Sequence, residues 1–168
     1  MELVFIRHGQ GEHTMDVPRS LQLKDPSLKP NGVKQAELLR NKFPLTNTEI
    51  VFISLIRRSL QTAFIWSETI DCRKIVSPFV SPRMFPILPR KKTLPCDETM
   101  DLEIIIKDYP TFEIDMNASL DFWSSGINVI SDSEFVKIAE EFIEVCKLSK
   151  TKKFILFLTM GQSLLIVN

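Results

Sequence analysis

The feature that most constrains the fold is a run of four apolar residues, Leu3-Val4-Phe5-Ile6, followed at once by Arg7-His8-Gly9-Gln10-Gly11. Four consecutive apolar residues are typical of a short parallel strand that is buried on both faces. The carboxyl end of such a strand is where an open α/β sheet usually holds its ligand. We therefore predict a functional site, rather than more core, directly after residue 6.

The residues that follow this strand suit the binding of an anion. Gly9 and Gly11 let the backbone turn tightly and approach a ligand closely. Arg7 offers a planar fork of donors that matches phosphate or carboxylate, and His8 can act as a nucleophile, a base or a ligand.

Two other interpretations of the same motif are open. A dinucleotide-binding turn needs a third small residue at position 14 at the start of a helix, and Thr14 followed by Pro18 disfavours it. A histidine at the end of a strand that merely caps the following loop, with no role in binding or catalysis, is also common. Motifs elsewhere in the chain are needed to decide between these alternatives.

Bulk composition limits the classes of function. At 168 residues and 44% hydrophobic, the chain is long enough for one domain with a single core. Its 21 basic and 21 acidic residues give no net charge, so we expect no nucleic-acid partner and no anionic membrane partner. Any affinity for phosphate must therefore come from a local group of basic residues and not from the charge of the whole chain.

The cysteines, the histidines and the amino terminus add further expectations. The three cysteines have no metal-type spacing and are expected to be reduced thiols. With two histidines and no cluster of soft ligands, we expect no metal and no cofactor. The start Met1-Glu2-Leu3 lacks the features of a signal peptide, and no apolar run approaches the length of a membrane span, so we expect a cytoplasmic location.

Hydrophobic patterns predict alternating strands and helices. Strands are expected at 50–53, 74–76 and 154–158, the last in the middle of the sheet, and a helix at 59–69 begins close to Arg58. Asn31 is expected to cap a helix. The apolar residues of that helix recur at helical spacing and are expected to face the sheet: Val33, Ala36, Leu39 and Phe43.

The carboxyl-terminal third holds the clearest helix signal. Ser131-Asp132-Ser133-Glu134 is a capping box. The helix after it has one apolar face, formed by Phe135, Ile138, Phe142 and Cys146. Between 77 and 130 the periodicity is weak and six of the ten prolines occur, so this stretch is predicted to be irregular.

Three motifs in order resemble those of the histidine phosphatase superfamily, also called the phosphoglycerate mutase-like family. They are Arg7-His8-Gly9, the stretch 25–36 that runs Asp-Pro-Ser-Leu-Lys-Pro-Asn-Gly-Val-Lys-Gln-Ala, and the stretch 54–63 that runs Ser-Leu-Ile-Arg-Arg-Ser-Leu-Gln-Thr-Ala. Gln10-Gly11-Glu12-His13 and Pro95-Cys96-Asp97 are similar to one branch of the family. The resemblance implies a single three-layer α/β domain over 1–168, with a mostly parallel central sheet, helices on both faces and a capping insertion at about 77–130.

The resemblance also implies a chemistry. His8 would take the phosphoryl group from a phosphate monoester as phosphohistidine, and Arg7 and Arg58 would hold its oxygens. Gly9 and Gln10 would complete the phosphate-binding loop. The partner is a small-molecule phosphate ester or inorganic phosphate.

The general acid is less well defined by the resemblance. Asp97 and Glu98 are the candidates, with Glu103 behind them. The Leu-Gln-Glu of the branch is not visible, and Met84-Phe85-Pro86 takes its place. All three carboxylates could instead be solvated loop residues.

The chain departs from the family at its carboxyl end. Members carry Ser-His-Gly or Ser-His-Asp-Gly after the last strand, whereas this chain has Thr159-Met160-Gly161, and a thioether cannot donate a hydrogen bond. The chain also stops at Asn168, so we expect a truncated carboxyl end. We hypothesise a one-base frameshift: one permitted back-translation, with two bases skipped after the codon of Ile155 (the frame that insertion of one base gives), reads Ile-Val-Ser-His-Asp-Gly-Thr and puts the lost histidine at Leu158. The gene sequence across codons 154–160 tests this.

The sequence therefore predicts a phosphomonoesterase-type hydrolase that acts through phosphohistidine, impaired by the missing second histidine. The alternative is a non-catalytic phosphate-binding or interaction module, a pseudoenzyme. A phosphoglycerate mutase is a weaker option, because the longer insertions of such enzymes are not evident in 168 residues.

Overall fold

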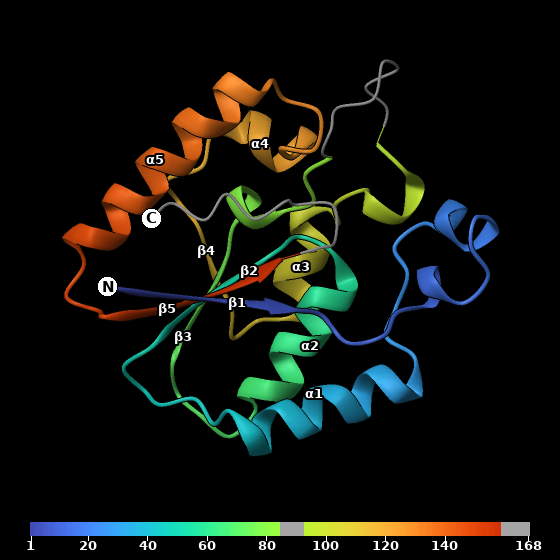
Figure 1. The fold of residues 1–168 in the computed structure, drawn as a ribbon, viewed down its shortest axis with the longest axis horizontal. Helices are drawn as coiled ribbons and strands as arrows, with labels where there is room; N and C mark the ends of the chain where they lie inside the picture. Colours follow the sequence, from blue (N-terminus) through green and yellow to red (C-terminus); the bar gives the residue numbers. More distant parts are fainter. Residues whose placement is uncertain (85–92, 159–168) are drawn as a thin grey trace.

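The computed structural model describes residues 1–84 and 93–158 (Figure 1). Its centre is a sheet of five strands in the order β1-β5-β2-β3-β4, and all four pairings are parallel. The strands are β1 (Glu2–Arg7), β2 (Ile50–Ile53), β3 (Arg73–Val76), β4 (Glu113–Ile114) and β5 (Lys153–Leu158). The mostly parallel sheet expected from the sequence is confirmed.

The strand order places the first and last strands of the described sheet side by side. β5 lies between β1 and β2, inside the sheet as predicted. Its last residue, Leu158, pairs with Arg7 at the end of β1. Because the strands are parallel, the segments that leave β1 and β2 start from the same edge, where a ligand site is expected.

Helices cover both faces of the sheet (Figure 1). One face packs against α1 (Pro30–Lys42), α2 (Arg57–Ser67) and α3 (Leu102–Asp108). The other face packs against α5 (Asp132–Leu148). The three-layer architecture is therefore confirmed.

Alternation along the strands divides the core in two. Val51 and Ile53 of β2 face the layer of α1, α2 and α3, where Trp66 is buried against them. Ile50 and Phe52 face the other way, toward α5. Burial on both faces explains why β2 is apolar at all four positions.

The N-cap predicted at the start of α5 is confirmed. The Ser131 hydroxyl accepts a hydrogen bond of 3.2 Å from the backbone N–H of Glu134. Ile138 and Cys146 are buried on the predicted face, and Phe142 packs beside them. A cap and an apolar stripe that agree are sufficient to define this helix from sequence.

The start of α1 differs from the prediction. Lys29 occupies the N-cap position and Pro30 the first helical position, where its missing N–H has no cost. Asn31 lies inside the helix, and its side-chain amide donates to the side-chain oxygen of Gln10 at 2.9 Å. Phe43 follows the helix and is 66% exposed; its carbonyl accepts from the indole N–H of Trp66.

The first strand also differs from the prediction. Within the described sheet β1 is an end strand that pairs only with β5, and Phe5 is 42% exposed. It is therefore not buried on both faces. A run of four apolar residues cannot by itself distinguish an inner strand from an end strand.

The stretch 77–130 is more regular than its proline content indicates. Besides α3 it contains β4, α4 (Leu120–Ser125) and the short 3-10 helices η3 (Pro78–Val80) and η4 (Pro95–Asp97). Helices and strands this short contain too few residues to show a hydrophobic period in the sequence. Residues 85–92 lie outside the described part of the chain.

Within the parts that are described, no helix has the length and apolarity needed to cross a membrane.

Candidate active site

His8 is the buried residue at the centre of the site, in the loop that follows β1. Its Nδ1 lies 2.7 Å from the carbonyl oxygen of Gly9, and its Nε2 lies 3.1 Å from Nε of Arg58. A carbonyl can only accept and a guanidinium can only donate. The ring therefore carries its proton on Nδ1, and the Nε2 lone pair accepts from Arg58.

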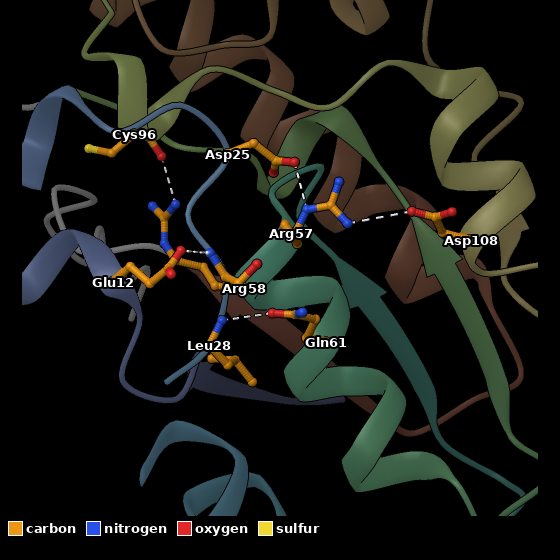
Figure 2. Close-up of polar contacts among 9 residues, drawn as sticks. Glu12, Asp25, Leu28, Arg57, Arg58, Gln61, Cys96 and Asp108 are labelled. Carbon is orange, nitrogen blue, oxygen red and sulfur yellow. Dashed lines mark hydrogen bonds and ion pairs between the residues drawn. The ribbon is translucent and has the colours of Figure 1, made fainter. Parts of the chain in front are cut away.

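Arg58 extends from the first turn of α2 and is 1% exposed. Its Nη1 donates to the carbonyl of Cys96 at 2.6 Å (Figure 2), and its Nη2 donates to the carboxylate of Asp97 at 2.9 Å. Each of the three nitrogens thus has a partner. Arg58 thus joins His8, in the loop after β1, to Asp97 in η4.

Arg57, the preceding residue, points elsewhere. It pairs with Asp25 at 2.6 Å and with Asp108 at 3.4 Å (Figure 2), so it ties the loop after β1 to the end of α3. Of the two adjacent arginines at the start of α2, only Arg58 reaches His8.

His13, on the 3-10 helix η1 (Glu12–Thr14), is a second buried imidazole in the same loop. Its ring meets that of His8 edge to face, with centroids 5.3 Å apart. Its Nδ1 is buried and, among the described residues, has no hydrogen-bond partner. His13 was not among the predicted site residues, although it belongs to the quoted motif Gln10-Gly11-Glu12-His13. The available signal was that it is one of two histidines in the chain and follows His8 closely.

Burial keeps both imidazoles neutral. Burial, followed by the charge of Arg58, lowers the pKa of His8 to about 3, although the bond to Gly9 opposes this. Burial and the charges of Arg58 and Arg7 lower the pKa of His13 to about 4. Burial raises the pKa of the Asp97 carboxyl even though Arg58 favours its charged form.

Arg7 stands at the end of β1 with an exposed side chain. Its charge acts on both His8 and His13, so it lies near both rings. Within residues 1–84 and 93–158, its side chain has no recorded ion pair or hydrogen bond. Arg7 is therefore available to an anion, whereas Arg58 is already bonded.

The predicted phosphate-binding residues Gly9 and Gln10 already use their backbone amides. Gly9 N–H donates to the Thr62 hydroxyl at 3.1 Å, and Gln10 N–H donates to the side-chain oxygen of Gln35 at 2.8 Å. A Cβ on Gly9 would lie 2.5 Å from the carbonyl oxygen of Gly32, so this close approach requires glycine. These contacts hold the loop in place and leave neither N–H unpaired.

The other candidate acid, Glu98, pairs outside the cluster of His8, Arg58 and Asp97. It is exposed, with its carboxylate 3.4 Å from Nζ of Lys24, and Glu103 is exposed on α3. Asp97 and Glu98 both line a cavity of about 320 Å³ whose wall also carries the hydroxyls of Thr99 and Ser124. The described residues contain no group of three or more side chains able to bind a metal.

The family's histidine motif aligns directly with 159–161, which lie outside the described residues, whereas the frameshift alignment puts the lost histidine at Leu158. Leu158 ends β5 and pairs through its backbone with Arg7.

Comparison with known proteins finds a family match over the first half of the chain. Residues 3–80 match the histidine phosphatase superfamily (branch 1). Comparison with curated proteins finds no match. The resemblance predicted from the motifs is confirmed by the family match.

Solved structures show the same fold. An ecdysone phosphate phosphatase from Bombix mori, in complex with tungstate, aligns with a TM-score of 0.60 at 15% identity, over 93% of this chain and 72% of that one. The α-ribazole phosphatase from Shigella flexneri aligns with a TM-score of 0.53 at 16% identity, over 96% and 74%.

Proposed function

The chain has the fold of the histidine phosphatases and matches their superfamily over residues 3–80. On this basis we propose that the protein is a phosphomonoesterase that uses His8 as its nucleophile. The observation that carries the proposal is the state of His8. It is neutral, with its proton held on Nδ1 by the Gly9 carbonyl, so its Nε2 lone pair lies on the side of Arg58. An unprotonated nitrogen next to a fixed cation is what phosphoryl transfer to histidine requires.

The reaction has two displacements at phosphorus. In the first, Nε2 of His8 forms a bond to phosphorus while the bond from phosphorus to the ester oxygen breaks, and the leaving oxygen takes a proton from Asp97. In the second, water attacks the phosphohistidine, the phosphorus–nitrogen bond breaks, and the proton from water returns to Asp97. The Gly9 carbonyl, which accepts from Nδ1, stabilises the positive ring that exists between the two steps.

The two arginines have different tasks. Arg58 must give up its bond to His8 before attack, because its Nε–H occupies the lone pair that reacts. Its freed N–H then faces the incoming phosphoryl group. Arg7, whose side chain is exposed, holds the oxygens from the other side.

Asp97 suits the role of acid better than Glu98. Burial raises its pKa, and Arg58 holds it in place. Glu98 is exposed and paired with Lys24. An elevated pKa leaves a larger fraction of a carboxyl group protonated at neutral pH, as a general acid requires.

We expect the rate to be low. The family's second histidine is absent from the sequence at 159–161. Loss of one preorganised donor to the transferring group typically costs about 100- to 1000-fold. Turnover by this chain should therefore be slow compared with that of an intact phosphatase.

One observation favours a second candidate, a protein that binds phosphate without turnover. All three nitrogens of Arg58 are engaged, and one of them covers the lone pair of His8. If phosphate cannot displace that bond, an anion would bind at Arg7 and His8 would stay unreacted.

Hydrolysis of an aryl phosphate distinguishes the two. We expect slow hydrolysis that disappears in His8→Ala and falls in Arg7→Ala, whereas Arg19→Ala, an exposed arginine in the following loop, retains it. Equal hydrolysis by the protein and by His8→Ala would overturn the role of His8. Binding of phosphate, seen by ³¹P NMR, without any hydrolysis would instead support the binding protein.

A further inference from the structure

His13 has the features of a ligand-binding group rather than of a structural histidine. It is 9% exposed, yet within the described residues its ring has no recorded hydrogen bond. Buried imidazoles normally satisfy at least one nitrogen. The imidazole is therefore able to form a hydrogen bond with a bound ligand.

The packing of His13 decides which nitrogen is available. Its Nδ1 lies against Gly11: a Cβ added there would come within 2.8 Å of it. This side of the ring is closed. The neutral ring is therefore best accommodated with its proton on Nε2, where the N–H can still reach a partner, because an enclosed N–H without an acceptor would cost about 1–3 kcal/mol.

The groups around His13 favour a negatively charged partner. His8 lies edge to face with it, and Arg7 and Arg58 act on it as positive charges. Two acidic groups of this region already have partners, since Asp97 accepts from Arg58 and Glu12 accepts from the backbone N–H of Ser27. Two cationic side chains and the nucleophile's ring thus act on or contact His13, which favours an anion as its partner.

We propose that His13 is a second catalytic imidazole of this site, which donates its Nε2–H to a phosphoryl oxygen held between Arg7 and Arg58. The inference rests on the proposed function, because it places phosphate at His8. It assigns to the loop after β1 a donor that the sequence lacks at 159–161. The two imidazoles would then have opposite roles, with Nε2 of His8 attacking phosphorus and Nε2–H of His13 binding an oxygen.

Imidazole ¹⁵N NMR of the whole chain tests the proposal directly, since the chain has only two histidines. The free protein should show the proton on Nδ1 for His8 and on Nε2 for His13. Addition of inorganic phosphate should shift the Nε2–H signal of His13 along a saturating curve. Unmoved His13 signals, while those of His8 shift, would overturn the proposal.

Two variants separate donation from packing. His13→Phe keeps a planar ring without a donor and should weaken phosphate binding about tenfold or more, as expected for loss of a hydrogen bond to a charged group. His13→Gln keeps an N–H and should recover part of the affinity. Phosphate affinity in His13→Phe equal to that of the unaltered protein would refute the inference.

The outcomes also separate this inference from the function on which it rests. If the unaltered protein binds no phosphate by ³¹P NMR, the proposed function fails and the role of His13 fails with it. If it binds phosphate and only the role of His13 is wrong, His13→Phe and the unaltered protein will titrate alike. Should His13→Phe not fold, the ¹⁵N titration of the unaltered protein decides alone.

Discussion

Because two neutral imidazoles are buried, we expect the stability of this protein to fall as the pH becomes mildly acidic. His8 and His13 are 6% and 9% exposed, and their pKa values are lowered from 6.5 to about 3 and about 4. In the unfolded chain both rings take up protons as the pH falls through 6.5, whereas in the folded protein they stay neutral. Protons therefore bind preferentially to the unfolded state, and stability is lost as the pH falls from 6.5 toward the folded pKa values.

The size of this effect follows from the two pKa values. Between pH 7 and pH 5, each ring should lower the free energy of unfolding by about 2 kcal/mol, or about 4 kcal/mol for both. The double variant His8→Gln/His13→Gln contains no histidine and is the matched control, since carboxylates and other groups contribute equally to both proteins.

Urea unfolding at pH 7 and pH 5, in buffers without phosphate, measures the difference. The unaltered protein should lose about 4 kcal/mol more than the double variant over this range. Each single variant should remove about half of the excess. An equal loss in the unaltered protein and the double variant would refute the burial of neutral imidazoles and, with it, the state assigned to the nucleophile.

Three further predictions concern the loop and its supports. Arg58→Lys should weaken phosphate binding about tenfold or more in a ³¹P titration, because one ammonium group cannot replace the guanidinium fork. Gly32→Ala should lower stability by about 1–3 kcal/mol in urea unfolding, because its Cβ would lie 2.2 Å from the carbonyl oxygen of Gln10. Ser77→Ala should cost about 1–2 kcal/mol in thermal unfolding, because the hydroxyl donates to the buried Asp115 carboxylate at 2.7 Å; an unchanged melting temperature would contradict this.

Much of the fold could be predicted from the sequence because its signals are local. The strand at 50–53 is apolar throughout since both its faces are covered, and α5 has both a capping box and an apolar stripe. By contrast, the exposure of Phe5 depends on which strand lies beside β1, which is a long-range property. The helix start at Pro30 was missed because Asn31, a good capping residue, instead bonds Gln10 from another segment.

The candidate site was only partly predictable for the same reason. The motifs indicated His8 and Arg58, but not that Arg58 donates to the lone pair of His8. That contact joins residues fifty positions apart in the chain. The burial of His13 against Gly11 likewise depends on how the loop folds back on itself, which a spacing pattern does not encode.

The central claim is that the Nε2 atom of His8 accepts a phosphoryl group, and chemical trapping tests it most directly. The protein would be mixed briefly with an aryl phosphate, quenched in alkali, in which phosphohistidine survives, and digested for mass spectrometry of the peptide that contains His8. The account predicts a phosphorylated peptide from the unaltered protein, loss of that label in acid, and none from His8→Ala. Hydrolysis without any label on His8, or a label that persists in His8→Ala, would contradict it.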